Sequence, residues 1–308
     1  MQQTTEKNNG GLIRQLGLFD TTMVITGIVI GSGIFLTTGI MARDVPSASL
    51  IMLAWLIGGL HALTGALTYA ELGASIPEAG GQYVYLREAY GRFAGYLFGW
   101  ISFTAYLTGI IAGLGVAFAE YFGYFFPVLG TGNILFEKDL PVLGWTYHYA
   151  LSMGQLVAVV LIIALSGFNY MGVVFGKIIQ NVSTIIKVGA ILIFIVLGLA
   201  AGPGEPIDWS INPSDFDFSR LMVGFGISLI AVMWATAGWE EVSFIAGEIK
   251  DPARNIPMAL VIGTATITLL YMLMNYVYLR AMPIDAMAGV VRIGEVTSNI
   301  LFGEIGAS

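Results

Sequence analysis

Long apolar stretches dominate the chain and are separated by short polar segments. Each stretch is about as long as the roughly 20 residues that a helix needs to cross a bilayer. Strands of a membrane barrel would instead alternate apolar and polar positions over about 10 residues. The pattern therefore predicts an all-α membrane protein with seven spanning helices, near residues 20–42, 48–72, 91–123, 150–169, 178–201, 220–246 and 257–281.

The composition supports this class and excludes others. Of the 308 residues, 56% are hydrophobic and 11% are charged, whereas soluble domains carry about 25% charged residues. The chain has no cysteine, which excludes a disulfide framework and a thiolate metal site; we expect no metal and no cofactor. The net charge of −7 argues against binding of nucleic acid.

The positions of Lys and Arg in the loops predict the orientation. With a cytoplasmic N-terminus, seven of the 13 Lys and Arg residues lie inside and five lie outside. The first apolar stretch is full-length and has no cleavage pattern, which argues against a signal peptide. Asp20, followed by two threonines, is typical of a helix N-cap opening this stretch. We expect a multi-pass protein of the cell membrane with its N-terminus in the cytoplasm.

Two of the apolar stretches contain residues that weaken a helix. Gly31-Ser32-Gly33 lies inside the first stretch, and two glycines cost about 2 kcal/mol relative to alanine. Two interpretations explain this feature equally well. One is close helix packing through Gly27 and Gly31, and the other is a discontinuous helix whose N–H groups face a substrate carboxylate. Ala235–Gly238 forms a second weak point, between Trp234 and Trp239. Two interrupted helices in corresponding halves indicate a binding site at a repeat interface.

Three polar positions within the apolar stretches are candidates for function. Lys187 lies roughly nine residues from either end of its stretch, too far to reach water easily, and a buried cation there is costly unless it is paired. Glu240 follows the second weak point, either in contact with substrate or hydrated where the helix restarts. Tyr271 and Asn275, one turn apart, are explained by hydrogen bonds between helices.

Three motifs in the chain resemble those of the amino acid–polyamine–organocation (APC) superfamily of secondary transporters. Residues 31–35 (GSGIF) resemble its first-helix signature, residues 69–91 its cytoplasmic segment, and residues 247–257 the loop after its sixth helix. The resemblance covers essentially the whole chain and is closest to the bacterial L-type-like branch. It implies a five-plus-five inverted repeat, usually of twelve helices, with broken first and sixth helices.

This family fold predicts how the chain is divided. Because the family has more helices than the chain supplies, and because no polar tail follows Ile305, we expect a chain truncated before the eighth helix. The expected parts are a cytoplasmic segment (1–19), the first five-helix repeat (20–201), an external loop (202–219), the first two helices of the second repeat (220–281) and an external loop (282–308).

The resemblance also implies a substrate site. The first broken helix would bind an amino acid carboxylate, carbonyl groups of both broken helices would bind its α-amino group, and an aromatic gate would cover it. The implied substrate-binding residues are Val29, Gly31, Ser32, Gly33, Trp234, Ala237 and Glu240. The implied coupling or gating residues are Lys187 and Tyr271, of which Lys187 occupies the place that sodium takes in related transporters. No catalytic residue is expected.

The predicted function is secondary active transport of L-amino acids by alternating access. We expect exchange or proton coupling without sodium, with neutral or broad specificity. Trp234 together with Glu240 resembles instead the cationic amino acid and polyamine antiporters, which is the alternative. A seven-helix channel or receptor-like protein is a different class, and the interrupted first helix argues against it. A membrane enzyme would need a nucleophile–base pair or a metal set, and the sequence offers neither. The expected partners are an amino acid and the lipid bilayer, and the oligomeric state is left open.

Overall fold

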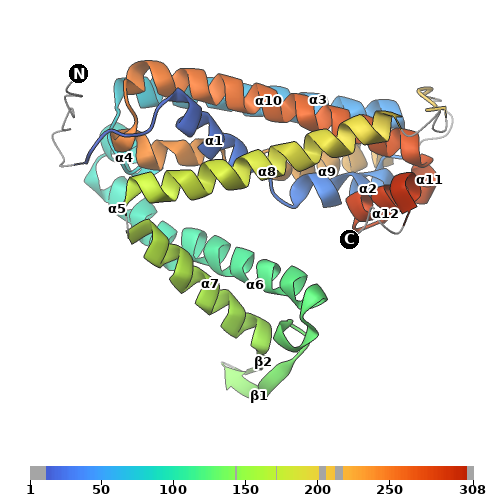
Figure 1. The fold of residues 1–308 in the computed structure, drawn as a ribbon, viewed down its shortest axis with the longest axis horizontal. Coiled ribbons are helices and arrows are strands. Elements are labelled where there is room, and N and C mark those ends of the chain that lie inside the picture. The colour runs from blue at the N-terminus through green and yellow to red at the C-terminus, as the bar shows by residue number, and fades with distance from the viewer. Residues whose placement is uncertain (1–11, 143, 171, 201–205, 212–217, 304–308) are drawn as a thin grey trace. The chain divides into compact units, whose positions relative to one another are not determined.

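The structure is a computed structural model that describes residues 12–142, 144–170, 172–200, 206–211 and 218–303. Helices account for most of these residues (Figure 1). They are α1 (Leu18–Val29), α2 (Gly33–Asp44), α3 (Ala48–Ser75), α4 (Gln82–Tyr90), α5 (Arg92–Ile101), the π-helix η1 (Ser102–Tyr106), α6 (Leu107–Phe125), the 3-10 helix η2 (Pro127–Leu129), α7 (Met153–Tyr170), α8 (Val173–Ala200), α9 (Phe218–Ala235), the 3-10 helix η4 (Trp239–Glu248), α10 (Pro252–Ala281), α11 (Ile284–Met287) and α12 (Ile293–Phe302).

Six apolar helical segments among the described residues are long enough to cross a membrane. They are Ala48–Ser75, Arg92–Phe125, Met153–Tyr170, Val173–Ala200, Phe218–Glu248 and Pro252–Ala281. The pair α1 and α2, bent by 40° at a short break, is a seventh candidate if the two helices are taken as one span. The seven predicted stretches thus correspond to six long helical segments and one bent pair.

The chain forms two compact units. The first contains the residues up to Gly81 together with those from Lys177 onward, and the second contains Gln82–Gly176. Of the predicted external loop at 202–219, residues 202–205 and 212–217 lie outside the described part of the chain. Residues 1–11 of the predicted N-terminal segment lie outside it as well. The predicted last loop contains α11 and α12, and residues 304–308 lie outside the described part.

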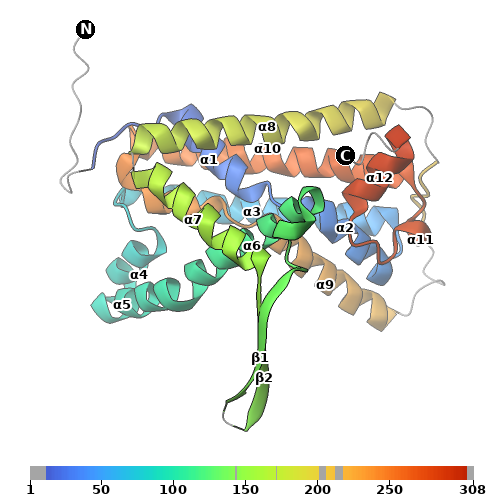
Figure 2. The same cartoon turned by 60° about the horizontal axis from the view of Figure 1, so that its bottom comes forward.

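The first unit is built around α3 and α10, which lie side by side (Figures 1 and 2). Small residues allow this close approach, because a Cβ atom added at Gly59 would overlap the side chain of Thr268 on α10. Gly58 faces Val232 of α9 in the same way. α1 packs on α10, and α2 packs on α9. The largest fully buried side chains include Trp55 and Tyr271. They belong to a hydrophobic core to which both halves of the bent pair contribute, α1 through Val29 and α2 through Ile34.

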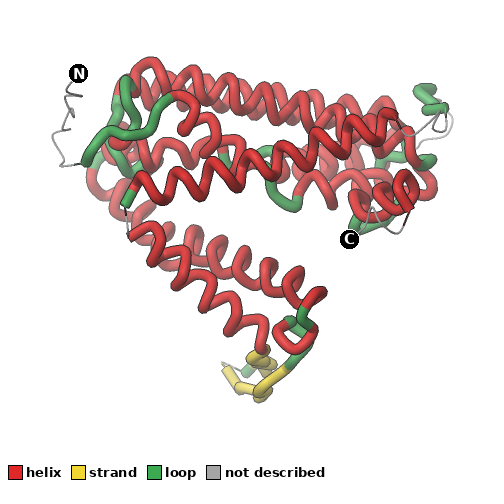
Figure 3. Tube along the Cα trace, in the orientation of Figure 1, coloured by secondary structure: helices red, strands yellow, loops and turns green. Residues whose placement is uncertain are grey.

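The second unit contains α4 to α7 and a β-hairpin. α6 and α7 pack against each other where an added Cβ atom at Gly115 would lie 3.2 Å from that of Ala158. The hairpin joins them and consists of the antiparallel strands β1 (Ile134–Val142) and β2 (Trp145–Ser152), shown in yellow in Figure 3.

The mostly helical fold agrees with the predicted class, but the hairpin is a departure from an all-α chain, and it also shifts the start of the predicted helix at 150–169. Trp145–Ser152 is rich in aromatic residues, which favour strands. Gly144, with φ of +86°, supplies the left-handed backbone that a tight hairpin turn needs. The helix α7 therefore begins only at Met153.

Candidate functional site

The first helix break lies where the sequence predicts it. α1 ends at Val29, Ile30 has an extended backbone, and α2 begins at Gly33. The N–H of Ile30 still donates to the Thr26 carbonyl over 3.0 Å, so the helical hydrogen bonding of α1 stops at that point. Gly31 and Ser32 are exposed. The first N–H groups of α2 have no partner within their own helix, as at any helix N-terminus.

The second helix break also lies at its predicted position. α9 ends at Ala235, and the chain resumes at Trp239 as the 3-10 helix η4. Gly238 has φ of +109°, a conformation that glycine adopts without steric cost. The Ala237 N–H donates to the Trp234 carbonyl over 3.3 Å. Three residues thus separate the α-helix α9 from the 3-10 helix η4 in the middle of a long apolar segment.

The side chain of Glu240 is hydrogen-bonded to the backbone of this second break. Its Oε2 accepts a hydrogen bond of 2.9 Å from the N–H of Gly238. In this structure its carboxylate, in the first turn of η4, therefore reaches back to the backbone N–H of the N-cap residue.

The two breaks are in contact with each other. A Cβ atom added at Gly33 would lie 2.8 Å from both Cα and Cβ of Ala235, and one added at Gly238 would lie 2.7 Å from the Ile28 side chain. The ring of Trp234 lies beside Gly33, and 63% of this residue is exposed. The backbone at the break between α1 and α2 therefore lies against the backbone at the break between α9 and η4.

Two polar side chains hold the end of α1. The Lys187 ammonium on α8 donates to the carbonyls of Gly27 and Ile30 over 3.0 and 3.1 Å. The hydroxyl of Tyr271 on α10 donates to the carbonyl of Val29 over 2.9 Å. A cation suits this place, because the C-terminal end of a helix carries partial negative charge.

Tyr271 belongs to a polar row on α10 that contacts both halves of the bent pair. The Asn275 amide nitrogen donates to the Tyr271 carbonyl over 2.8 Å, and its Oδ1 accepts from the hydroxyl of Thr38 on α2. The Tyr278 hydroxyl donates to the Ile34 carbonyl over 3.4 Å. The predicted hydrogen bonding of Tyr271 and Asn275 between helices is confirmed.

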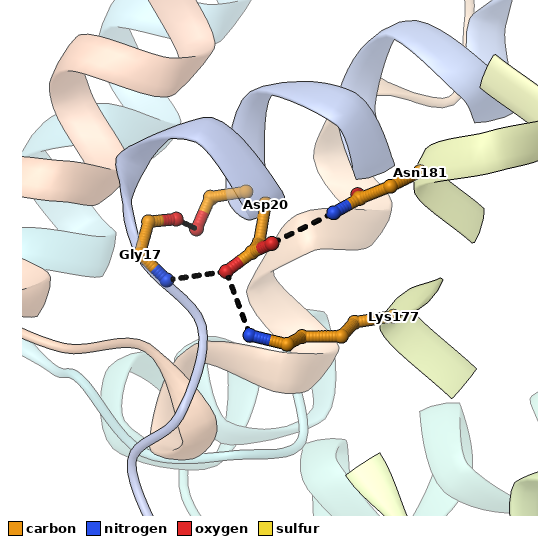
Figure 4. A network of polar contacts seen from close by, with 5 residues as sticks. Gly17, Asp20, Lys177 and Asn181 are labelled. Atoms are coloured by element: carbon orange, nitrogen blue, oxygen red, sulfur yellow. Dashed lines mark hydrogen bonds and ion pairs between the residues drawn. The ribbon is translucent and has the colours of Figure 1, made fainter. Parts of the chain in front are cut away.

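A polar network at the start of α1 was missed by the sequence analysis (Figure 4). Asp20 accepts from the Asn181 amide over 2.7 Å and lies 3.3 Å from the Lys177 ammonium. The predicted N-cap role of Asp20 is wrong, because the N-cap is Gly17 and Asp20 is the third residue of α1. Its carboxylate instead reaches back to the Gly17 N–H over 3.0 Å, because a side chain in the first helical turn can bind the capping residue.

The network continues along one face of α8. Thr184 donates to the Met23 carbonyl over 3.0 Å, between the contacts of Asn181 and of Lys187. The signal in the sequence is the spacing of Lys177, Asn181, Thr184 and Lys187, since residues three and four apart lie on the same face of a helix. Within the described part of the chain, no three His, Asp or Glu side chains could hold a metal ion.

Comparison with known protein families shows to which family the chain belongs. The family model described as amino acid permease matches residues 16–307. The chain belongs to the amino acid permease family. The resemblance to the APC superfamily is thereby confirmed, and the permease is a multi-pass membrane protein of a family of transporters rather than enzymes.

Curated relatives of the permease are named as amino acid transporters. It is 30% identical over 306 residues to the serine/threonine exchanger SteT of Bacillus subtilis, covering 98% of this chain and 63% of SteT. It is 31% identical over 284 residues to the human b(0,+)-type amino acid transporter 1, covering 91% and 54% of the two chains. With the rabbit (Oryctolagus cuniculus) large neutral amino acids transporter small subunit 2, identity is 28% over 283 residues, covering 90% and 50%. The permease chain thus spans between half and two thirds of the length of these relatives.

Proposed function

We propose that the permease is a secondary active transporter that moves L-amino acids across the cell membrane by alternating access. The observation that carries the proposal is the contact between the two helix breaks at Gly33 and Ala235. Discontinuous helices that meet in this way supply N–H groups for anionic and carbonyl groups for cationic parts of a substrate. We place the N-terminus in the cytoplasm, from the distribution of Lys and Arg.

The groups around the breaks match an amino acid zwitterion. The segment Gly31-Ser32-Gly33 at the start of α2, of which Gly31 and Ser32 are exposed and Gly33 is buried, would bind the carboxylate, favoured by the positive end of the helix dipole. The carbonyls of Val29, Trp234 and Ala237 would bind the α-amino group. Those of Val29 and Trp234 already accept one hydrogen bond each, and a carbonyl oxygen has two lone pairs.

Lys187 supports coupling without sodium. Its ammonium already satisfies the two carbonyls of Gly27 and Ile30, so a second cation at this place would face like-charge repulsion. Lys187 and Tyr271 together hold the end of α1 and would be the residues that couple its position to the bound substrate or to a proton.

Neutral or broad specificity fits the structure better than the cationic alternative. Glu240 binds the Gly238 N–H, so its carboxylate is engaged by the backbone. The names of SteT and of the large neutral amino acids transporter agree with a neutral amino acid substrate. The cationic amino acid or polyamine antiporter remains the second candidate, carried by Trp234 and Glu240 at the second break.

Counter-transport in proteoliposomes tests the proposal. Labelled alanine, leucine, arginine and putrescine are offered outside, with or without unlabelled amino acid inside, at two pH values and with sodium or choline as the cation. We expect trans-stimulated uptake of alanine or leucine that does not depend on sodium. A preference for arginine or putrescine would select the antiporter, and flux without saturation or trans-stimulation would indicate a channel.

A substitution within the site refines this test. Ser32→Ala is expected to weaken amino acid binding by roughly 1–3 kcal/mol if the hydroxyl binds a buried carboxylate. Ser183→Ala, an exposed position on α8, is the matched control and should leave affinity unchanged. Equal affinity of the two variants would remove Ser32 from the substrate site.

A further inference from the structure

The hairpin formed by β1 and β2 has two faces of different chemistry. Side chains alternate between the faces of a strand, and directly opposed residues of an antiparallel pair share a face. The register pairs Asp139 with His148 and Lys138 with Tyr149. It follows that one face, the polar face, carries Glu137, Asp139, Pro141, Thr146 and His148. The other face, the aromatic face, carries Phe136, Lys138, Leu140, Trp145, Tyr147 and Tyr149.

The polar face is suited to water. The Nδ1 atom of His148 lies 2.7 Å from Oδ1 of Asp139, and its Nε2 atom lies 3.8 Å from Oε2 of Glu137. All three side chains are more than half exposed. Two carboxylates and an imidazole in this arrangement would lose hydration in an apolar setting, which is costly for charged groups.

The aromatic face exposes large apolar side chains. Trp145 is 81% exposed, Tyr147 is 62% exposed and Phe136 is 52% exposed. Exposed apolar surface of this kind marks an interaction site. Lys138 is the charged residue among the aromatic-face residues named above, so the face combines aromatic rings with a positive charge.

The base of the hairpin lies at the end of a membrane-spanning segment. Asn133 connects it to η2, which follows α6, and to the start of α7, because its side-chain amide donates to the Val128 carbonyl over 2.9 Å and its backbone carbonyl accepts from the Met153 N–H over 2.8 Å. Aromatic residues gather at the boundary between membrane and water. Exposed aromatic side chains gather at this end of α6, at Tyr121, Tyr124, Phe125 and Phe126.

The hairpin does not continue the direction of the helices that carry it. Figures 1 and 2 both show it leaving the ends of α6 and α7 at a steep angle to both. Since α6 and α7 belong to segments that cross the bilayer, a hairpin that turns away from their axes at the boundary can lie along the membrane surface with one face toward lipid.

We infer that the aromatic face of the hairpin lies in the lipid headgroup layer of the membrane that α6 and α7 span. Trp and Tyr rings place their apolar parts toward the acyl chains and their polar atoms toward the headgroups. The Lys138 ammonium reaches the lipid phosphates while its methylene groups remain among the rings. The acidic polar face, which phosphates would repel, is turned to water. The inference does not depend on the proposed transport activity.

Single cysteines can test the inference directly, because the chain contains none. Tyr147→Cys on the aromatic face and Thr146→Cys on the polar face are neighbours that are both exposed. Each variant of the full chain is labelled with a nitroxide and reconstituted in vesicles of phosphatidylcholine and phosphatidylglycerol. Collision with oxygen, which concentrates in lipid, is compared with collision with a water-soluble nickel chelate. Lys138→Cys and Glu137→Cys repeat the comparison on β1.

We expect a severalfold higher ratio of oxygen to nickel collisions at positions 147 and 138 than at 146 and 137. Equal exposure of both faces to the nickel chelate would show a hairpin that projects into water and would overturn the inference. Protection of position 147 from both reagents would show that protein, such as a second copy of the chain, covers the face. Lipid exposure of both faces would contradict the assignment of the faces.

Discussion

Gly33→Ala tests the contact on which the proposed site depends. The added Cβ atom would lie 2.8 Å from both Cα and Cβ of Ala235, a separation far below the usual 3.5–4.0 Å between carbon atoms. One of these two atoms belongs to the backbone, so no side-chain rotation relieves the overlap. The substitution must push α2 and α9 apart or prevent the two breaks from meeting.

The expected cost follows from the overlap. Extra carbon in a well-packed interior typically costs about 1–3 kcal/mol. Gly33 is the first residue of α2, where alanine offers little of the roughly 1 kcal/mol helix-propensity gain that it brings to a helix interior. We therefore expect the free energy of unfolding of Gly33→Ala to fall by about 1–3 kcal/mol. Ala235→Gly in the same chain should restore only part of this loss, because it removes Cβ but leaves Cα.

Denaturant titration in detergent micelles, followed by tryptophan fluorescence, measures this change. Gly226→Ala in α9 is the matched control, since an added Cβ atom there meets nothing within 4 Å. It should be at least as stable as the original chain. If Gly33→Ala were equally stable, or if Ala235→Gly had the same effect with and without Gly33→Ala, the two breaks would not be in contact and the proposed site would lose its basis.

Three further predictions concern the groups that hold the site and the hairpin. Tyr271→Phe should lower the free energy of unfolding by about 0.6–1.7 kcal/mol, from the average to the maximum for hydrogen bonds between membrane helices. Tyr276→Phe, whose ring stacks on a tryptophan, should change it less, and equal effects would contradict the hydroxyl contact. Glu240→Gln keeps an acceptor for the backbone and should affect alanine and arginine uptake alike, and selective loss of arginine uptake would favour the antiporter. The hydrogen bond and charge of Asp139 raise the pKa of His148 above its ordinary value, so their pairing stabilises the hairpin at low pH and is lost as pH rises through the raised pKa. Asp139→Asn should lower that pKa in an NMR titration, and an unchanged value would exclude the pair.

The sequence predicts the helical segments well because their signal is local. A long apolar run has few alternatives to a helix in a bilayer, where every backbone polar group needs a partner. The breaks are predictable for the same reason, since Gly31-Ser32-Gly33 and Gly238 weaken a helix wherever they occur. The apolar pattern fails at residues 150–152, which form the end of β2 instead of the first turn of the predicted helix, and it gives no sign of the hairpin.

The partners of the predicted site residues were not predictable from the sequence. Lys187 stands out because it is a cation in an apolar run, but which carbonyls it binds depends on how α8 packs beside α1. Asp20 resembles an N-cap in the sequence, yet its main partners lie about 160 positions away along the chain, on α8. Glu240 is ambiguous in the sequence for the same reason, since only the geometry of the second break shows that its carboxylate reaches the Gly238 N–H.

Both halves of the bent pair contribute to the buried core, α1 through Val29 and α2 through Ile34, Met41 and Ala42. They differ in their side-chain hydrogen bonds, and this difference bears on alternating access. α2 is hydrogen-bonded to α10 through Thr38 and the Ile34 carbonyl. α1 is held in part by side-chain hydrogen bonds from α8 and α10 to its carboxylate and carbonyl groups, at Asp20, Met23, Gly27, Val29 and Ile30. Hydrogen bonds of this kind within membranes average about 0.6 kcal/mol each, so the set amounts to a few kcal/mol. That is the range of free energy over which a bound ligand shifts a conformational equilibrium. If the proposed mechanism holds, we expect α1 rather than α2 to be the half that changes position, with Lys187 and Tyr271 the contacts that must be released.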